Sequence, residues 1–143
     1  MRIVPITREF LRNNLNSFID ILKNIPHEYW GEDHFLMELP GKWDYSIAAI
    51  DHGKIIGYLI ASDKTEKIHI HKFMVGPQFQ SQGIGKALLK EIINISLNNN
   101  KLSITLKVYT DNQRAIKFYL EKGFNIIQSN GELHSMRLDL TRK

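Results

Sequence analysis

Gln80–Leu89 reads QSQGIGKALL and places two glycines one residue apart, directly ahead of apolar residues at helical spacing. A glycine turn that leads into a helix exposes unpaired backbone N–H groups at the positive end of the helix dipole. Glycine also lets the backbone approach phosphate oxygens without a Cβ in the way, so this turn is a candidate anion site. The donors would be the amides from Gln82 to Lys86, and Lys86 would add a positive charge.

Two familiar phosphate-binding motifs do not fit this turn. A Walker loop needs a glycine where the chain has Gln80, and a serine or threonine where it has Ala87. The dinucleotide fingerprint needs a third small residue where the chain has Leu88. On spacing alone, a tight strand-to-helix turn without a ligand remains an alternative.

Two blocks of the sequence, the one that contains this turn and a second one downstream, resemble motifs of the same protein superfamily. Val75–Leu89, VGPQFQSQGIGKALL, resembles the acetyl-CoA signature of the GNAT N-acetyltransferase superfamily, Gln/Arg-x-x-Gly-x-Gly/Ala after the end of a strand. Asp111–Phe124, DNQRAIKFYLEKGF, resembles the N-x-x-A-x-x-Φ-Y-x-x-x-G-F helix of the same superfamily. With their strands, the two blocks cover roughly half of the chain, and the earlier residues match only in the order of elements.

The resemblance implies where acetyl-CoA binds, and we expect no metal. The pyrophosphate would lie on the glycine turn, and the pantetheine arm would run along the strand that precedes it. The implied binding residues are Phe73, Met74, Val75, Gln80, Ser81, Gln82, Gly83, Ile84, Gly85, Lys86 and Asn112. An oxyanion formed at the thioester carbonyl would meet a backbone N–H near Val75.

The resemblance also places Tyr119 near the coenzyme sulfur, as the general acid that protonates the departing thiolate. A phenol with a reference pKa of about 10 carries its proton at neutral pH. The alternative is a tyrosine packed with Phe118 on the inner face of its helix.

Two histidines, His69 and His71, are the candidate general bases. Strand alternation would put both on one face together with Phe73 and Val75. This pair resembles the paired histidines of the serotonin N-acetyltransferase branch, and a reference pKa of about 6.5 suits a proton acceptor. Some ribosomal-protein acetyltransferases have a glutamate base where this chain has Lys107. The pair could instead be hydrogen-bonded at the sheet face, or be half of a metal site, although nothing has ligand spacing to complete one.

The acceptor amine would enter opposite the coenzyme, between residues 25–35 and 129–134. Tyr29 and Trp30 could bracket an amine. The carboxylates that could attract its charge are Glu28, Glu32 and Asp33. A solvated acidic loop whose aromatic residues fill the core is the alternative. The acceptor class stays open between a small amine, a peptide N-terminus and a lysine.

The periodicity of the chain predicts an α/β (α+β) fold of the order β-α-α-β-β-β-α-β-α-β-β. As in the GNAT fold, a mixed and largely antiparallel central sheet would be flanked by helices. Thr7 would cap a helix that ends before Ile25-Pro26, and Gly123 would end the helix over 111–122. The other expected helices cover 33–39 and the segment from Gln80 to the asparagines at 98–100; the expected strands cover 2–5, 46–50, 54–61, 68–75, 102–109, 124–128 and 134–140.

Length and composition limit the class of protein. The 143 residues suit one domain, and 43% apolar with 24% charged residues suits a globular chain. No cysteine is present, so disulfides, thiolate metal sites and cysteine nucleophiles are excluded. No run approaches the roughly 18 apolar residues of a membrane span, and the first residues do not resemble a secretory signal. We expect a cytoplasmic protein that does not bind membranes.

The net charge of +4 comes from 19 basic and 15 acidic residues spread along the chain. A mild surplus suits a phosphorylated small molecule, whereas nucleic-acid binding usually needs a clustered patch. We therefore expect acetyl transfer from acetyl-CoA to a primary amine and no nucleic-acid partner, and the chain could form a homodimer. The rival interpretations are a CoA-binding sensor without turnover and, less favoured, a nucleic-acid-binding module.

Overall fold

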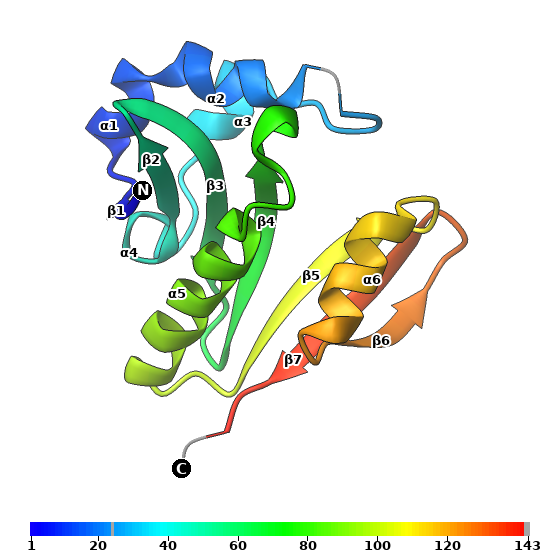
Figure 1. The fold of residues 1–143 in the computed structure, drawn as a ribbon. Helices are drawn as coiled ribbons and strands as arrows, with labels where there is room; N and C mark the ends of the chain where they lie inside the picture. Colours follow the sequence, from blue (N-terminus) through cyan, green and yellow to red (C-terminus); the bar gives the residue numbers. More distant parts are fainter. Residues whose placement is uncertain (24, 142–143) are drawn as a thin grey trace.

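The computed structural model describes residues 1–23 and 25–141. In this part of the chain, one seven-stranded sheet runs in the order β1-β2-β3-β4-β5-β7-β6 (Figure 1). All neighbouring strands are antiparallel except β4 and β5, which are parallel. The strands are β1 Arg2–Pro5, β2 Ile47–Asp51, β3 Lys54–Asp63, β4 Lys67–Val75, β5 Ser103–Tyr109, β6 Asn125–Ser129 and β7 Leu133–Asp139.

Helices cover both faces of this sheet (Figure 1). The helices are α1 Arg8–Asn13, α2 Leu15–Leu22, α3 Glu32–Leu36, α4 Lys42–Tyr45, α5 Ile84–Asn98 and α6 Gln113–Glu121, with a 3-10 turn over Pro77–Phe79. α1, α2 and α3 pack on one face, where Phe18 and Phe35 meet Tyr58 of β3. α5 and α6 cover the other face, where Leu88 and Ile92 are fully buried. The predicted mixed and largely antiparallel fold is confirmed.

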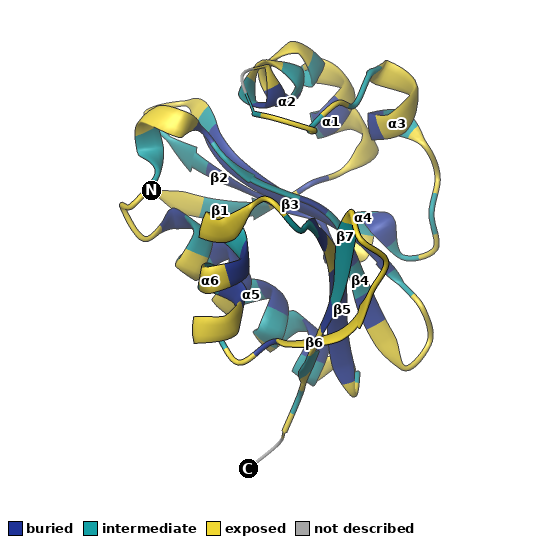
Figure 2. Ribbon diagram, turned by 90° about the vertical axis from the view of Figure 1, so that its right-hand side faces the viewer, coloured by how far each residue is buried: buried dark blue, intermediate teal, exposed yellow. Residues whose placement is uncertain are grey.

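Burial falls off toward one edge of the sheet (Figure 2). The central strands β2, β3, β4 and β5 carry most of the buried strand residues, whereas all five residues of the outer strand β6 are exposed. Tyr58, at the centre, donates a hydrogen bond from its hydroxyl to the Phe18 carbonyl at 3.0 Å. The centre of the sheet is therefore its most densely packed part.

The N-terminal helices differ from the sequence prediction. Thr7 caps α1 as expected, accepting from the Phe10 amide at 3.0 Å. The expected single helix breaks at Asn14, whose side chain donates back to the Phe10 carbonyl at 2.8 Å. Asparagine competes for backbone groups in this way, so one predicted helix becomes α1 and α2. Residue 24, at the expected end of that helix, lies outside the described residues.

The second predicted helix also ends early. α3 stops at Leu36 instead of residue 39, and Met37 already has an extended backbone. The buried Lys42 ammonium donates to the Phe35 and Met37 carbonyls and so satisfies groups that a longer helix would have used. Lys42 itself lies in α4, a short helix that the sequence pattern did not predict.

The centre of the sheet opens between its two parallel strands. β4 and β5 pair only over 67–70 and 103–106, and beyond these residues the strands separate (Figure 1). A β-bulge accompanies the opening, because Ala61 faces Ile70 whereas Ile60 faces Lys72, which leaves His71 as the extra residue. After the bulge, Phe73 lies on the same face as Ile70, next to α5 and α6.

Candidate active site

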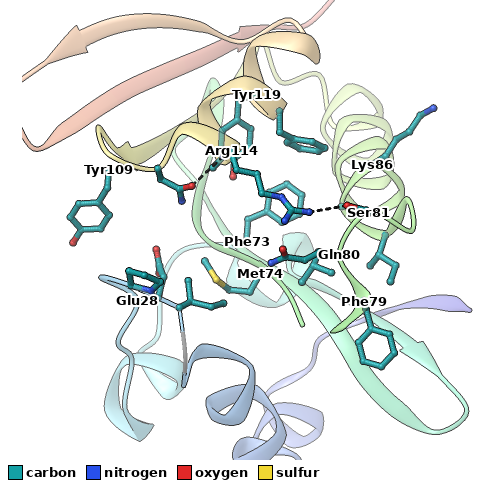
Figure 3. A pocket seen from close by; sticks show the side chains of 18 of the residues that line it. Glu28, Phe73, Met74, Phe79, Gln80, Ser81, Lys86, Tyr109, Arg114 and Tyr119 are labelled. Atoms are coloured by element: carbon teal, nitrogen blue, oxygen red, sulfur yellow. Dashed lines mark hydrogen bonds between the residues drawn. The ribbon is translucent and has the colours of Figure 1, made fainter. Parts of the chain in front are cut away.

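A cavity of about 550 Å³ fills the opening between β4 and β5 (Figure 3). Its walls come from the end of β4, the glycine turn, the start of α5, α6, the end of β5 and the connection between α2 and α3. From the candidate set, eleven residues line it: Phe73, Met74, Val75, Gln80, Ser81, Gly83, Ile84, Gly85, Lys86, Asn112 and Tyr119. Gln82, His69 and His71 are not among the lining residues.

The glycine turn has the backbone geometry of an anion site. Ser81 and Gly83 both have a positive φ, 68° and 81°, and α5 begins at Ile84 without a side-chain cap. The first helical bond runs from the Ala87 amide to the Gly83 carbonyl at 3.0 Å, so the amides before Ala87 have no partner within the helix. These N–H groups, at the positive end of a 15-residue helix, suit a pyrophosphate.

Two cations flank the turn. Lys86 lines the cavity from α5, and Arg114 lines it from α6. The Arg114 guanidinium donates to the Ser81 hydroxyl at 3.0 Å, so α6 is joined to the turn (Figure 3). The Gln82 side chain instead turns back to the Gln78 carbonyl at 3.4 Å. Sequence reasoning did not single out Arg114, although its place two residues after the Asn112 cap of α6 was a usable signal.

The free edge of β4 suits the pantetheine arm. The Gly76 amide donates to the Ile56 carbonyl at 2.8 Å, which fixes the phase of the ladder between β3 and β4. By the alternation of an antiparallel ladder, Phe73 and Val75 direct their N–H and C=O groups away from β3, into the gap that β5 has left. Asn112, across the gap, uses its side-chain oxygen to cap α6 by accepting from the Ala115 amide at 3.2 Å.

Tyr119 is buried in the wall of the cavity and is only 8% exposed. Its ring packs against Phe73, Phe118 and Phe124, with centroids 6.1, 5.5 and 5.4 Å away. Burial first, and then the negative charge of Glu28, raise the pKa of the Tyr119 phenol above its ordinary value. The phenol therefore keeps its proton throughout the neutral range, as a proton donor must. The expected contact with Phe118 also forms, so packing and proton donation are compatible here.

The two histidines lie on the other face of the sheet from Phe73 and Val75. The expectation that all four share one face is wrong, because strict alternation does not survive the bulge at His71. His69 Nδ1 lies 2.8 Å from the Thr105 hydroxyl, and His71 Nε2 lies 2.7 Å from the hydroxyl of Ser62, the residue before Asp63 at the end of β3. The two rings contact each other edge to face, with centroids 4.9 Å apart.

This environment disfavours the charged form of both histidines. Burial, with a smaller effect of the His71 charge, lowers the pKa of His69 to about 4. Burial, followed by the nearby Lys64 and Lys42, also lowers the pKa of His71. Both rings are therefore neutral at pH 7, with a weakened tendency to accept a proton.

The connection between α2 and α3 closes the acceptor side of the cavity. His27 stacks on Tyr109 of β5, with ring centroids 4.4 Å apart, and its Nε2 lies 2.8 Å from Asp111. The next residue, Glu28, lines the cavity and forms an ion pair with Lys72 of β4. The connection thus spans the gap between the separated strands, from β4 to β5.

The expected aromatic bracket for an amine does not form. Tyr29 is 77% exposed, and Trp30 is not among the lining residues. Trp30 packs edge to face on Phe35 and stacks on His34. Of the three candidate carboxylates, only Glu28 lines the cavity.

Comparison with known proteins agrees with this geometry. The family model described as "Acetyltransferase (GNAT) family" matches residues 15–124, more than three quarters of the chain. The chain belongs to the GNAT family. The predicted family and enzyme class, an acyltransferase, are thereby confirmed.

Two relatives are themselves named as N-acetyltransferases. The N-alpha-acetyltransferase RimI of Mycobacterium tuberculosis is 25% identical over 122 residues, which is 77% of this chain and 75% of that protein. The uncharacterized N-acetyltransferase MJ1207 of Methanocaldococcus jannaschii is 31% identical over 80 residues, which is 51% of this chain but only 35% of that protein. The match therefore spans about a third of one relative and three quarters of the other.

Solved structures share the fold at low sequence identity. The ribosomal-protein-S18-alanine N-acetyltransferase from Escherichia coli superposes with a TM-score of 0.84 at 20% identity, over 99% of this chain and 95% of that one. The PaiA N-acetyltransferase from Thermoplasma acidophilum, solved in complex with coenzyme A, gives a TM-score of 0.78 at 18% identity, over 96% and 98%. The matching family model, which is described as an acetyltransferase, agrees with the coenzyme predicted from the sequence.

The residues of this chain fit that coenzyme. Unpaired amides, two cations and a free strand edge lie along one cavity, in the order that a pyrophosphate followed by an amide-bearing arm requires. Within residues 1–23 and 25–141, no helix has the length and apolar character to cross a bilayer. The same residues contain no group of three histidine or acidic side chains placed to hold a metal ion.

Proposed function

We propose that the chain transfers the acetyl group of acetyl-CoA to a primary amine, directly and in a ternary complex. The observation that carries this proposal is the single cavity that joins the open start of α5 to Tyr119 and Glu28. A site that only binds the coenzyme needs the first part of this cavity. The second part, with a buried phenol and a carboxylate, suits chemistry at the thioester.

The chain's own groups have distinct tasks in this reaction. Bound acetyl-CoA supplies an acetyl thioester. The turn over 80–86 and the edge of β4 hold its diphosphate and its arm, so that the thioester meets the Tyr119 hydroxyl. As the acceptor nitrogen bonds to the carbonyl carbon, the carbon–sulfur bond breaks and Tyr119 donates its proton to the departing sulfur. The proton of the acceptor ammonium leaves to a base, and Tyr119 recovers a proton from solvent.

The base proposed from the sequence is His69 or His71. A role for them through a chain of water molecules stays a prediction, because neither lines the cavity. Their lowered pKa values and their hydroxyl partners also fit a packing role. Single substitutions to glutamine separate the two roles, since only a base would change the pH dependence of turnover.

For the acceptor we propose the α-amine of a peptide N-terminus. Two names support this choice. The mycobacterial relative is named an N-alpha-acetyltransferase, and the E. coli protein of known structure is named a ribosomal-protein-S18-alanine N-acetyltransferase. The cavity is also accessible from solvent at the α2–α3 connection, because Pro26 and His27 line it there and are exposed. A small amine or a lysine side chain is the competing acceptor.

The test is release of the CoA thiol with a panel of amines. The panel contains heptapeptides that begin with alanine, serine or methionine, an N-blocked peptide with one lysine, a free amino acid and a polyamine. We expect turnover with a free peptide N-terminus and at least tenfold less with the blocked peptide. Coenzyme binding without turnover across this panel would favour a CoA sensor, and salt-sensitive DNA or RNA binding that CoA does not displace would favour a nucleic-acid module.

A further inference from the structure

Glu28 is the carboxylate that enters the cavity from the acceptor side. Its side chain is only 15% exposed and lines the same cavity as Tyr119, whereas its ion-pair partner Lys72, 9% exposed, does not line the cavity. Figure 3 shows Glu28 and Tyr119 reaching this pocket from different elements. A buried carboxylate with a cation behind it is a negatively charged group held in place and facing a substrate space.

The backbone that leads into Glu28 is held by several contacts. His27 has a positive φ of 66°, and the Glu28 amide donates to the Ile25 carbonyl at 3.2 Å, so the segment forms a tight turn. His27 attaches this turn to the far wall through Tyr109 and Asp111. The turn therefore spans the opening between β4 and β5, with Glu28 directed inward.

Lys72 reaches Glu28 because of the bulge in β4. The extra residue at His71 moves Lys72 and Met74 to the face of the sheet that α1, α2 and α3 cover. There the Lys72 ammonium lies 5.4 Å from the centre of the Trp30 ring and pairs with Oε2 of Glu28. The second oxygen, Oε1, accepts no hydrogen bond from the residues that the structure describes, so it is available to a ligand.

We propose that Glu28 binds the acceptor ammonium and takes its proton, and that Lys72 positions Glu28 for this task. The inference rests on the proposed function and names the group that recognises the amine. One N–H bond of the ammonium breaks, its proton moves to the carboxylate directly or through one water molecule, and the freed electron pair forms the bond to the acetyl carbon. The proton on Glu28 then leaves to solvent, and Tyr119 protonates the sulfur.

The charge distribution around Glu28 agrees with this assignment. The titratable groups that face it are Lys72 on β4, Tyr58 on β3 and Tyr119 on α6, with His27 and Asp111 at the mouth of the cavity. Burial first, and then the negative charge of Glu28, raise the pKa values of Tyr58 and Tyr119. The Glu28 carboxylate therefore interacts electrostatically with the Tyr119 phenol, which donates the second proton.

The test compares pH profiles of kcat/KM for an alanine-initiated heptapeptide. An enzyme that binds the ammonium and removes its proton has a flat profile from pH 6 to about pH 8, where the peptide ammonium itself titrates. The Glu28→Gln variant can react only with amine that is already neutral. We expect its activity at pH 6.5 to fall at least about 100-fold and then to rise tenfold per pH unit up to about pH 8.

Controls separate a chemical role from a structural one. Glu32→Gln removes an exposed carboxylate at the start of α3 and should leave the profile unchanged. The double variant Glu28→Gln/Lys72→Met leaves no unpaired buried charge and should show the same slope as Glu28→Gln. A peptide that begins with 3-fluoroalanine, whose ammonium is more acidic, should restore activity to Glu28→Gln more than to the wild type.

Calorimetry gives a second measurement that does not depend on turnover. With CoA bound, at pH 6.5, the alanine peptide should bind at least tenfold more weakly to Glu28→Gln than to Glu32→Gln. The inference is wrong if Glu28→Gln keeps a flat profile, if the wild type itself shows the rise with pH, or if His69→Gln or His71→Gln produces the rise instead. A wild type that turns over no amine in the panel would overturn the proposed function first, and this role with it.

Discussion

Replacement of Gly85 by valine should weaken the binding of CoA, whereas alanine, which the family signature also allows at this position, should only stabilise the free protein. Gly85 lies in the first turn of α5, and a Cβ there would meet Phe118 at 3.7 Å and Val75 at 3.8 Å, both ordinary contacts. Alanine is favoured over glycine within a helix by up to about 1 kcal/mol, which corresponds to a rise of about 3 °C in Tm for a domain of this size.

Valine adds two methyl groups beyond this Cβ, which lies in the cavity between two of its lining residues. These methyl groups keep phosphate oxygens from approaching the turn to the ordinary N···O distance of about 2.9 Å. Loss of one hydrogen bond to a charged oxygen costs about 1.5–3 kcal/mol, so Kd for CoA should rise about 10- to 100-fold. Titration calorimetry measures Kd, and thermal unfolding without ligand measures Tm.

A matched variant at the neighbouring glycine should behave differently. Gly83 has a φ of +81°, and a Cβ there would meet nothing within 4 Å. Gly83→Ala should therefore lower stability by about 1–2 kcal/mol through backbone strain alone. If Gly85→Val binds CoA as tightly as the wild type does, the amides at the start of α5 do not hold the coenzyme.

Three further substitutions test other parts of the site. Tyr119→Phe should lower kcat about 100-fold and leave the Kd for CoA within twofold, and a kcat that stays at the wild-type value would remove the acid assignment. Arg114→Ala should raise the Kd for CoA about three- to tenfold and weaken its dependence on salt, both visible by calorimetry at two ionic strengths. Since the pKa of His69 falls from 6.5 to about 4 on folding, unfolding takes up a proton between these values, and stability is lost as pH falls from 6.5 to 4. Urea titrations of wild type and His69→Gln should differ in this loss by about 2 kcal/mol after allowance for partial exposure, and equal losses would contradict the assigned pKa.

The parts of the fold that sequence reasoning predicted correctly have local causes. The Thr7 cap, the α5 turn and the left-handed Gly123 depend on a few adjacent residues. Long elements with strong apolar periodicity, such as β3 and α5, were also predicted, with ends within two residues for β3. The coenzyme half of the site follows from the same local signals, since seven of its predicted residues, Gln80 to Lys86, are consecutive.

The parts that were missed depend on tertiary contacts. The early end of α3 depends on Lys42, which reaches the Phe35 and Met37 carbonyls from α4, a helix that packs against β3. The bulge in β4 exists because β3 pairs with it in a shifted register, and it reverses the faces that strict alternation assigned to His69 and His71. No periodicity in a single strand records such a shift.

The acceptor half of the site was only partly predictable for a related reason. Glu28 was one of three acidic candidates within residues 25–35, and the sequence does not say which of them points inward. Its selection depends on Lys72, which is 44 residues away and faces Glu28 only because of the bulge, and on the contacts of His27 with the far wall. Sites built from long-range pairs of this kind carry little local signal.

The central inference is that the amides at the start of α5 hold the coenzyme. A titration of the ¹⁵N-labelled protein with CoA, followed in ¹H–¹⁵N correlation spectra, observes these amides directly. We expect the largest chemical-shift changes at the amides of Gly83, Ile84, Gly85 and Lys86, and we expect them to saturate together with those of Val75 on β4. Saturable binding that leaves the amides of residues 83–86 unchanged, or no binding at all, would contradict this inference.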